Sequence, residues 1–395
     1  MIPAPTAIVV IFWVCVAAVC FAYFGYPVIL WQLARWFGRP IHAPEEGADL
    51  PTLSLLIAAH NEEAVIDGRI RNALAMDYPQ EKLEIVVASD GSVDATAAIV
   101  QRYADRGVRL LDYGPRRGKA ATLNAAIPTL KGDIVLLSDA NTYTDAPAAR
   151  KIVRWFNDPK VGVVCGRLVL TDPATGGNAD SLYWKYETFL KRCENRLGAL
   201  LGSNGAIYAI RRSLFEPIPV NTILDDFVIP LQAKLRTGCA LVYDGEAVAR
   251  EETAPNVRAE FQRRSRIGAG GFQSILHLWR LLSPVHGWVA FSFFCHKIIR
   301  WLCPFFMLGA LLSNLLLLGD SFYFGTFVAQ VSFYTLSMVA AFLPARFRPL
   351  KPLRLTTMFT SMNLALLVGF WRFARGGQTG LWRRTARLAE TQIVS

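Results

Sequence analysis

The sequence predicts an α/β domain with a mainly parallel sheet, joined to apolar helices near both ends of the chain. Between Pro51 and Glu260, short apolar strands alternate with amphipathic helices and polar turns, a pattern typical of a doubly wound sheet. Outside that stretch lie apolar runs long enough to cross a bilayer, and the whole chain is 53% hydrophobic but only 18% charged. This composition excludes a wholly soluble protein and a disordered one.

The first apolar run is predicted to be a retained transmembrane anchor, residues 1–34. No charged residue precedes Arg35, and the run from Pro5 to Leu33 exceeds the ~20 residues that cross a hydrocarbon core of ~30 Å. It lacks the basic start of a secretory signal and is longer than a signal's apolar core. Because Arg35 and Arg39 follow the run, we expect the N-terminus outside and the middle domain in the cytoplasm.

Three further apolar runs follow the middle domain, at Trp301–Gly319, Ser321–Ala345 and Leu355–Trp371. If the last run crossed the membrane, the arginines after it would lie outside, against the positive-inside rule. We therefore expect it to be interfacial or re-entrant. We therefore expect a multi-pass protein of the inner membrane. Its expected parts are an anchor (1–34), a sheet domain (50–260), interfacial helices (261–298), transmembrane or re-entrant helices (299–373) and a cytosolic basic tail (374–395).

The net charge of the chain is +11, from 42 Lys and Arg against 31 Asp and Glu. Much of the excess flanks the apolar runs, where anionic lipid headgroups attract it. The sequence has no zinc finger, RNP-type aromatic motif or basic helix pair, so no nucleic-acid partner is expected. The seven cysteines are odd in number and form no C-x-x-C pair, which disfavours a disulfide scaffold or a zinc module.

The middle domain begins with four strands in alternation with three helices. The strands are expected at Leu53–Ala59, Leu83–Ala88, Val108–Tyr113 and Ile134–Leu137. The helices are expected from after Glu63 to about Met76, at Ala95–Arg106 with Ser92 or Asp94 as its cap, and from Lys119 to Ile127. Because open α/β sheets bind ligands beyond the carboxyl ends of their strands, the residues that follow each strand are candidates for a site.

Acidic residues and a lysine occupy these strand ends. Asp90 and Asp94 follow the second strand, Asp139 and Asn141 follow the fourth, and Lys119 begins the helix between them. A carboxylate can accept hydrogen bonds from a base or ribose, a lysine at a helix N-terminus favours phosphate, and Asp139 with Asn141 suits Mg²⁺ or Mn²⁺. The pattern predicts a nucleoside-diphosphate site. Taken singly, Asp94 is better explained as a helix cap and Lys119 as a solvated loop charge.

Two glycine-rich segments are not interpreted as nucleotide loops. Gly114–Lys119 resembles a P-loop, but its glycine spacing is one residue short and Ala120 replaces the Ser or Thr that would hold Mg²⁺. Gly268–Gly271 lies within an Arg-rich helical stretch and follows no strand.

The second half of the domain supplies a candidate base. We expect an amphipathic helix at Asp180–Arg196, a tight turn at 202–205, a strand at Ala206–Ile210 and a helix from Asp225 to Arg236. Either Asp225 or Asp226 is expected to cap that last helix. The other is free to act as a base, because adjacent carboxylates repel and the pKa of one rises.

Five short motifs in this order resemble the membrane-integrated branch of glycosyltransferase family 2, which has the GT-A fold. This branch includes the cellulose, chitin-oligosaccharide, hyaluronan and poly-N-acetylglucosamine synthases, and the resemblance covers the chain from about Leu53 to its end. The motifs are Ala58-Ala59-His60-Asn61-Glu62, Asp90-Gly91-Ser92-x-Asp94, Gly118-Lys119-Ala120 with Asn124, Asp139-Ala140-Asn141, and Asp225-Asp226.

The resemblance implies an inverting, metal-dependent transfer of a sugar from a nucleotide sugar, here expected to be a UDP-sugar, to a polysaccharide or lipid-linked acceptor. The residues implied to be catalytic are Asp226, Asp225, Arg263 and Arg266. Those implied to contact the acceptor or donor sugar are Gly202, Ser203, Asn204 and Gly205. The nucleotide sugar would be held by Ala59, Asn61, Glu62, Asp90, Lys119, Asn124, Ser138, Asp139 and Ala140, and Mg²⁺ or Mn²⁺ by Asp139 and Asn141. Membrane lipids and other polysaccharide-synthesis proteins are the further expected partners.

The chain departs from the family pattern at three places. Asn141 replaces the second acid of D-x-D, Asp225 replaces the Glu of T-E-D, and the Q-x-x-R-W motif is degraded. In the register that begins at Arg263, Arg266 matches the arginine and Ile267 replaces the tryptophan that would stack on the acceptor. A single-transfer enzyme is therefore at least as well supported as a processive synthase. The rival reading is a degenerate, non-catalytic subunit that binds a nucleotide sugar; a transporter would need more spans.

Overall fold

The computed structural model describes residues 6–45, 47, 49–171, 182–253, 257–342, 351–377 and 380. The chain divides into two compact units, which are described separately. The sheet unit comprises residues 30–256, 273–292 and 379–395, and the helical unit comprises residues 1–29, 257–272 and 293–378.

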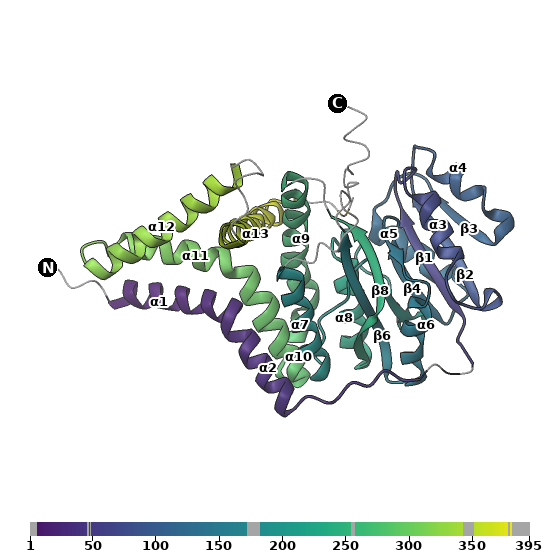
Figure 1. Cartoon of the computed structure of the whole chain (residues 1–395), viewed down its shortest axis with the longest axis horizontal. Coiled ribbons are helices and arrows are strands. Elements are labelled where there is room, and N and C mark those ends of the chain that lie inside the picture. The colour runs from purple at the N-terminus through teal and green to yellow at the C-terminus, as the bar shows by residue number, and fades with distance from the viewer. Residues whose placement is uncertain are drawn as a thin grey trace. The chain divides into compact units, whose positions relative to one another are not determined.

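The sheet unit is built on an eight-stranded mixed sheet in the order β3-β2-β1-β4-β7-β6-β8-β5 (Figure 1). Its strands are β1 Leu53–Ala59, β2 Leu83–Asp90, β3 Val108–Tyr113, β4 Ile134–Asp139, β5 Tyr143–Thr144, β6 Val161–Thr171, β7 Tyr208–Arg211 and β8 Ala240–Glu252. β1, β2, β3 and β4 are mutually parallel, and β6 is parallel to β8. β7 runs antiparallel to β4 and β6, and β5 runs antiparallel to β8. The predicted α/β fold with a mainly parallel sheet is confirmed.

The register of the parallel strands determines where the site lies. Leu53 of β1 pairs with Leu83 of β2 and with Ile134 of β4, so the three strands advance together. At the other end, Ala58 therefore pairs with Asp139. Because parallel strands end at one edge of a sheet, the polar residues after β1, β2 and β4 emerge side by side.

Helices cover both faces of this sheet. They are α3 Ile66–Leu74, α4 Thr96–Gln101, α5 Lys119–Ala126, α6 Ala148–Val153, α7 Leu182–Arg196 and α8 Asp225–Thr237. One face of β1, with Leu53, Leu55 and Ile57, packs in a single core with apolar residues of α3, α4 and α6. α5 contacts β1 and β2, and α8 contacts β6 and β8. Successive side chains of β1 point to opposite faces of the sheet, so this one strand packs against helices on both faces.

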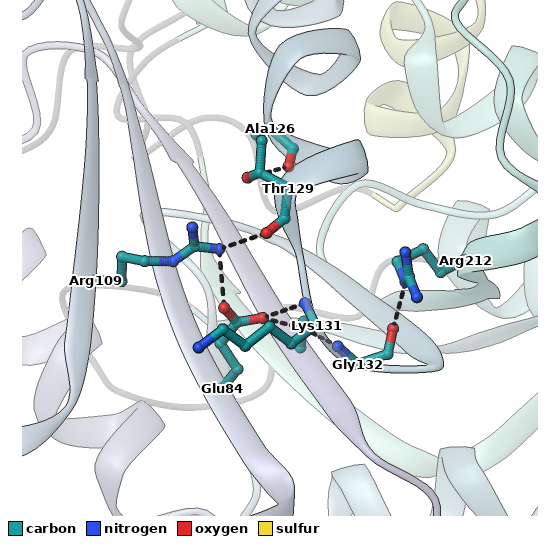
Figure 2. Close-up of polar contacts among 8 residues, drawn as sticks. Glu84, Arg109, Ala126, Thr129, Lys131, Gly132 and Arg212 are labelled. Atoms are coloured by element: carbon teal, nitrogen blue, oxygen red, sulfur yellow. Dashed lines mark hydrogen bonds and ion pairs between the residues drawn. The ribbon is translucent and has the colours of Figure 1, made fainter.

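The amino-end edge of the sheet is tied together by Glu84 of β2 (Figure 2). Its carboxylate forms an ion pair with Arg109 of β3 at 2.8 Å and accepts a hydrogen bond from the backbone N–H of Lys131 at 2.9 Å. Arg212, which follows β7, donates to the carbonyl of Gly132 at 2.9 Å. These contacts join β2, β3, β4 and β7 far from the strand ends that carry the candidate site.

Several predicted boundaries shift by a few residues. β2 and β4 extend two residues beyond their expected ends, to Asp90 and Asp139. The helix expected to reach Arg106 ends at Gln101 and continues as a separate 3₁₀ turn. Its N-cap position is Ala95, which makes no side-chain capping bond, so neither Ser92 nor Asp94 is the N-cap. Asp94 Oδ1 nevertheless accepts the N–H of Thr96, the first residue of the helix, at 3.0 Å.

The expected cap of α8 is wrong. Leu224 occupies its N-cap position and makes no side-chain capping bond, so neither Asp225 nor Asp226 is the N-cap. Both aspartates instead lie in the first turn of the helix. The expected strand at Ala206–Ile210 is β7, at Tyr208–Arg211, and residues 180 and 181 of the expected amphipathic helix lie outside the described part.

The helices outside the sheet include three stretches long and apolar enough to cross a membrane, Thr6–Trp36, Trp288–Leu315 and Ser321–Ala341. The elements are α1 Thr6–Cys20, η1 Phe21–Gly25, α2 Tyr26–Trp36, α9 Val257–Leu278, α10 Trp288–Ser292, η9 Phe293–Ile298, α11 Ile299–Leu315, α12 Ser321–Phe342 and α13 Lys351–Ala374 (Figure 1).

The second apolar stretch begins at Trp288, earlier than the Trp301 expected from the sequence. His296, Lys297 and Arg300 interrupt the apolar run there, but the helix continues through them. α13 is a single helix that contains the third predicted run. Most of the predicted basic tail, like the arginines at 346 and 348, lies outside the described residues.

Candidate functional site

A lysine and two aspartates form the centre of the site. Lys119 is the first residue of α5, and its Nζ lies 2.8 Å from Asp139 Oδ1 at the end of β4 and 3.2 Å from Asp225 Oδ2 at the start of α8. The side chains of Lys119 and Asp225 are 20% and 8% exposed, whereas that of Asp139 is 36% exposed. Of these two acids, Asp139 is the one that a ligand can reach more easily. Of the predicted strand-end residues, Asp139 contacts Lys119 directly, while Asp90 bonds the backbone of Gly118 just before it.

Asp226 has the electrostatic environment of a base. Burial and the charge of Asp225 raise its pKa to about 6, and Asp139 adds to the rise, while Lys119 and Lys191 oppose it. The same acids act on Lys119: burial disfavours its charge, but Asp139 and Asp225 more than offset this and leave its pKa above the usual value. At neutral pH the cluster therefore holds an ammonium and a carboxylate poised close to its own titration.

Tyr208 of β7 adds a buried hydroxyl to the cluster. Its side chain is fully buried, and its hydroxyl has no hydrogen-bond partner in the described part of the chain. Burial and the charges of Asp225, Asp226 and Asp139 raise its pKa well above the usual value. The neutral phenol therefore remains a donor at the base of the acid cluster.

Asp90 organises the loop that leads into Lys119. Its carboxylate is fully buried and accepts the N–H of Arg117 at 2.7 Å and that of Gly118 at 3.0 Å. Arg116 Nε lies 4.0 Å away. The close approach of this loop requires Gly91, whose φ is +61° and whose added Cβ would lie 2.5 Å from the Arg116 nitrogen. The predicted contact of Asp90 with the nucleotide stays a prediction.

The residues after β1 form a bridge to the end of β2. Asn61 has φ +55°, its Oδ1 accepts the N–H of Val93 at 2.9 Å, and its own N–H donates to Ser92 Oγ at 3.1 Å. Glu62 is buried, and its N–H donates to Thr96 Oγ1 at 2.8 Å. Ala59 is fully buried in β1. These contacts explain why a turn-forming Asn stands here, since Asn tolerates the left-handed region.

The residues next to Asp139 in the chain make different contacts. Ser138 is buried and donates to the carbonyl of Ala206 at 2.8 Å, and Ala140 lies in the apolar core. Asn141 donates from Nδ2 to Glu251 Oε1 at 2.8 Å. This bond orients the amide and leaves its oxygen as the atom of Asn141 that could reach a cation.

The donor set around Asp139 fits a divalent cation that is shared with a diphosphate. No group of three or more His, Cys, Asp or Glu side chains forms a protein-only metal site among the described residues. Mg²⁺ and related ions are commonly held by one or two carboxylates together with substrate phosphates. The half-exposed carboxylate of Asp139 and the amide oxygen of Asn141 match that type of site.

The predicted turn at 202–205 lies against the same cluster. An added Cβ at Gly205 would lie 2.9 Å from Asp139 Oδ2 and 3.7 Å from Lys119 Nζ. Ser203 donates from both its N–H and its hydroxyl to the carbonyl of Asp226, at 3.1 and 2.6 Å. Asn204 donates to the carbonyl of Gly166 at 3.0 Å, and Gly202 has φ +73°. The turn thereby packs directly beside the acids and the first turn of α8.

Asn124 lies one turn along α5 and faces a backbone segment. It donates to the carbonyl of Ile218 at 2.7 Å and accepts the N–H of the same residue at 3.0 Å. Both polar ends of its amide are thus used to hold residue 218, and the predicted nucleotide contact stays a prediction.

The predicted arginines belong to the helical unit. Arg263 and Arg266 lie on α9, and Arg263 pairs with Glu260 at 2.9 Å. Burial of Glu260 is outweighed by Arg263 and Arg264, which hold the pKa of that carboxyl below its usual range. Their catalytic role stays a prediction.

Two basic residues that lie near the site were not predicted from the sequence. Lys191, on α7, lies over the ring of Tyr243 at 5.9 Å, and its charge acts on Asp226. Arg69, on α3, is fully buried, with Nε and Nη2 lacking partners among the described residues. Burial lowers its pKa to about 10, against the opposing effects of Tyr143 and Asp139. Its position on the apolar face of α3, between Ile66 and Ile70, was the available signal.

This strand order and the acid cluster at its carboxyl edge define the sheet unit as a GT-A fold. Residues 54–218 match the model of glycosyl transferase family 2, so this part of the chain is similar to that family. The motif-based recognition is therefore confirmed.

Curated relatives are similar over the same region. The β-monoglucosyldiacylglycerol synthase of Synechocystis sp. is 28% identical over 267 residues, which cover 64% of this chain and 55% of that protein. The poly-β-1,6-N-acetyl-D-glucosamine synthase of Staphylococcus aureus is 27% identical over 241 residues, which cover 58% of this chain and 56% of that protein. The chain thus spans about half the length of these relatives.

A solved structure has the same fold over almost the whole chain. The mannosyltransferase PcManGT from Pyrobaculum calidifontis, in complex with GDP-Man and Mn²⁺, superposes with a TM-score of 0.70 at 20% identity. The match covers 92% of this chain and 99% of that chain.

Proposed function

We propose that this protein is an inverting, metal-dependent glycosyltransferase that uses a nucleotide sugar, in particular a UDP-sugar. The acceptor in this proposal is a polysaccharide or a lipid-linked acceptor at the inner membrane face. The observation that carries the proposal is the convergence of Lys119, Asp139, Asp225 and Asp226 at the carboxyl ends of β4 and the start of α8.

Asp226 is the proposed general base. Its carboxylate takes the proton of the acceptor hydroxyl while that oxygen forms a bond to the anomeric carbon of the donor. The bond between the anomeric carbon and the phosphate oxygen breaks on the opposite side, and the nucleoside diphosphate leaves with the electron pair. A single displacement of this kind inverts the configuration at the anomeric carbon. A base with a pKa of about 6 is ionised at pH 7 and still basic enough to accept the proton.

Positive charge beside the leaving group is the second requirement. Lys119 lies at the N-terminus of α5, where its ammonium and the helix end both favour an anion. A divalent cation held by Asp139, Asn141 and the phosphates would stabilise the charge that develops on the diphosphate. Lys119 is placed to hold and orient the same phosphates, because it already bridges Asp139 and Asp225.

The test is release of UDP from UDP-sugars by the full chain in nanodiscs, with Mg²⁺ or Mn²⁺ and after chelation. Asp226→Asn should lower kcat by about 10²–10⁴-fold, the range for loss of a general base, and leave donor binding largely intact. Asp105→Asn, which changes an exposed aspartate in the 3₁₀ turn Ala104–Arg106, is the matched control and should keep wild-type activity. Equal activity of Asp226→Asn and wild type would refute the assignment.

The alternative function is a non-catalytic subunit that binds a nucleotide sugar. Asn141 favours this alternative, because a neutral amide stands where the family pattern has the second acid of D-x-D. A chain that binds the donor but releases no UDP with any acceptor would support this alternative.

The membrane arrangement is proposed with the N-terminus outside and the sheet unit in the cytoplasm. It is supported by the absence of charge before Arg35 and the basic residues after it. A reporter that is active only outside the membrane should be silent when fused after Ser395. Activity of that fusion would contradict the proposed re-entrant or interfacial α13.

A further inference from the structure

The 218–223 segment leads into α8 without regular secondary structure. Residues 215–224 form neither helix nor strand, and the residue before Asp225 makes no side-chain capping bond. Ile218 and Ile223 are nevertheless buried. Because buried backbone groups outside a helix or strand need other hydrogen-bond partners, the partners of this segment help to determine where α8 begins.

Two side-chain amides are these partners. Asn124 of α5 accepts the N–H of Ile218 at 3.0 Å and donates to the carbonyl of the same residue at 2.7 Å. Gln273 of α9, a buried residue that belongs to the sheet unit, accepts the N–H of Ile223 at 3.0 Å and donates to the carbonyl of Asn221 at 2.9 Å. Each amide thus uses its oxygen and its nitrogen at once, as a neighbouring strand would, and together they hold the segment at both ends.

The two amides act on the elements that carry the acid cluster. Asn124 lies on the same short helix as Lys119, whose Nζ is 3.2 Å from Asp225 Oδ2. The bonds of Asn124 to Ile218 therefore join the helix of the lysine to the segment before the aspartates. Gln273 holds the other end of that segment, two residues before the first turn of α8. The position of the aspartates relative to the lysine therefore depends on both amides.

We propose that Asn124 and Gln273 are positioning residues that fix the 218–223 segment and thereby place the two aspartates of α8 opposite the lysine of α5. The inference rests on the proposed function, in which Asp226 is the base. A displacement of about 1 Å can cost ~10²-fold in rate, so an amide that touches no reacting atom can still control turnover. This role also accounts for an asparagine of the family motif, since both polar ends of the Asn124 side chain are engaged by one backbone residue.

The test measures UDP release by the full chain in nanodiscs for Gln273→Met and Asn124→Leu. Each substitution keeps a side chain of similar size and removes both hydrogen bonds of the amide. We expect kcat to fall by about tenfold to hundredfold with little change in the donor KM, because the nucleotide half of the site is left intact. An unchanged kcat in either folded variant would overturn the role of that residue. A raised donor KM at an unchanged kcat for Asn124→Leu would overturn it as well, because that result indicates contact with the nucleotide.

The pH profile distinguishes positioning from a general loss of structure. After burial, the charges that act on Asp226 are those of Asp225, Lys119, Asp139 and Lys191, in that order. Asp225 is the neighbour of Asp226 in α8 and keeps its effect when the first turn of the helix is displaced, whereas the effect of Lys119 weakens. The rising limb of kcat/KM against pH should therefore move to higher pH in both variants. A limb that stays in place or moves to lower pH would show that the acids are still held opposite the lysine, and would overturn the proposal.

Arg212→Met is the matched control. Arg212 also donates to a backbone carbonyl, that of Gly132 at 2.9 Å, but at the amino-end edge of the sheet (Figure 2). This variant should keep the wild-type kcat and the wild-type position of the limb. Hydrogen–deuterium exchange of residues 218–226 should be faster than in the wild type for Gln273→Met and Asn124→Leu, and unchanged for Arg212→Met. Unchanged exchange in all three variants would contradict the proposal.

Two further comparisons keep the result interpretable. Gln273→Ala leaves room for water at the backbone groups of Asn221 and Ile223, so it should fold even where the methionine variant does not, and it should lower kcat in the same way. The inference and the proposed function can fail separately. Wild-type activity of Asp226→Asn would refute the base, whereas loss of activity in Asp226→Asn together with wild-type kcat in both amide variants would refute only the positioning.

Discussion

The clearest test of the acid cluster is a pair of substitutions that should move the pH profile in opposite directions. The pKa of Asp226 is raised from 3.8 to about 6, by burial first and by the charge of Asp225 second. Activity that needs the ionised base therefore rises with pH through about 6. Asp225→Asn removes the like charge and should move this rising limb of the pH–activity profile to lower pH. Lys119→Met removes a compensating positive charge and should move the limb to higher pH.

The expected size of each movement follows from the same contacts. Removal of the like charge of Asp225, which ranks second to burial among the causes, should return the limb toward 3.8 by about one pH unit, or ~1.4 kcal/mol. The charge of Lys119 is the next largest influence on the pKa of Asp226 after that of Asp225, so loss of Lys119 should raise the limb, and by less than loss of Asp225 lowers it.

The assay is kcat/KM for the donor between pH 5 and 9, because this parameter reports groups of the free enzyme. Only the position of the limb is compared, since both variants are expected to lower its height. Asp105→Asn serves as the control and should keep the wild-type position. Movement of both variants in the same direction, or no movement in either, would show that Asp226 is not the titrating base.

Three further predictions separate chemistry from stability. Asp226→Asn should stabilise the fold at pH 7.5 by ~1–3 kcal/mol, seen as a higher Tm. The pKa of Asp226 is about 6 in the folded protein and lower in the unfolded chain, so the wild type loses stability as the pH rises from about 4 to 6 and does not regain it above that range. An equal Tm of both proteins at pH 7.5 contradicts this. Gly205→Ala places a Cβ 2.9 Å from Asp139 Oδ2 and should raise the donor KM by about tenfold with little change in Tm; an unchanged KM would show that the turn is not part of the site. Glu84→Ala, at the opposite edge of the sheet, should do the reverse. It removes the ion-pair partner of Arg109, which keeps its bond to the carbonyl of Thr129, and leaves the N–H of Lys131 without its acceptor, so stability should fall by ~1–3 kcal/mol in thermal unfolding while the donor KM stays constant.

The strand-end residues could be predicted from the sequence because their placement depends on local pattern. Apolar segments separated by helices predict parallel strands, and the register from Leu53 to Leu83 and Ile134 then brings Asp90, Lys119 and Asp139 to one edge. No knowledge of side-chain packing is needed for this step. The same reasoning predicts the nucleotide half of the site.

The remaining parts of the site depend on packing across the sheet, which the sequence pattern does not specify. Lys191 acts on Asp226 from a helix whose register against β8 is determined by side chains such as Asn195, which bonds the backbone of Tyr243. The predicted cap of α8 is wrong for a related reason. Two adjacent aspartates at a helix start look like caps, but here the positive charge of Lys119 draws Asp225 into the cluster.

Asp90 connects the predicted nucleotide half of the site to its catalytic half. Its carboxylate holds the N–H of Gly118, the residue immediately before Lys119, and a buried carboxylate bonded to backbone N–H groups is a rigid anchor. That anchor sets where α5 begins, and so where the Lys119 ammonium meets Asp139 and Asp225. Because Lys119 in turn opposes the rise in the pKa of Asp226, a contact at the end of β2 influences the ionisation of a base at the start of α8. The coupling runs through the hydrogen bond between the Gly118 N–H and Asp90, which fixes the start of α5.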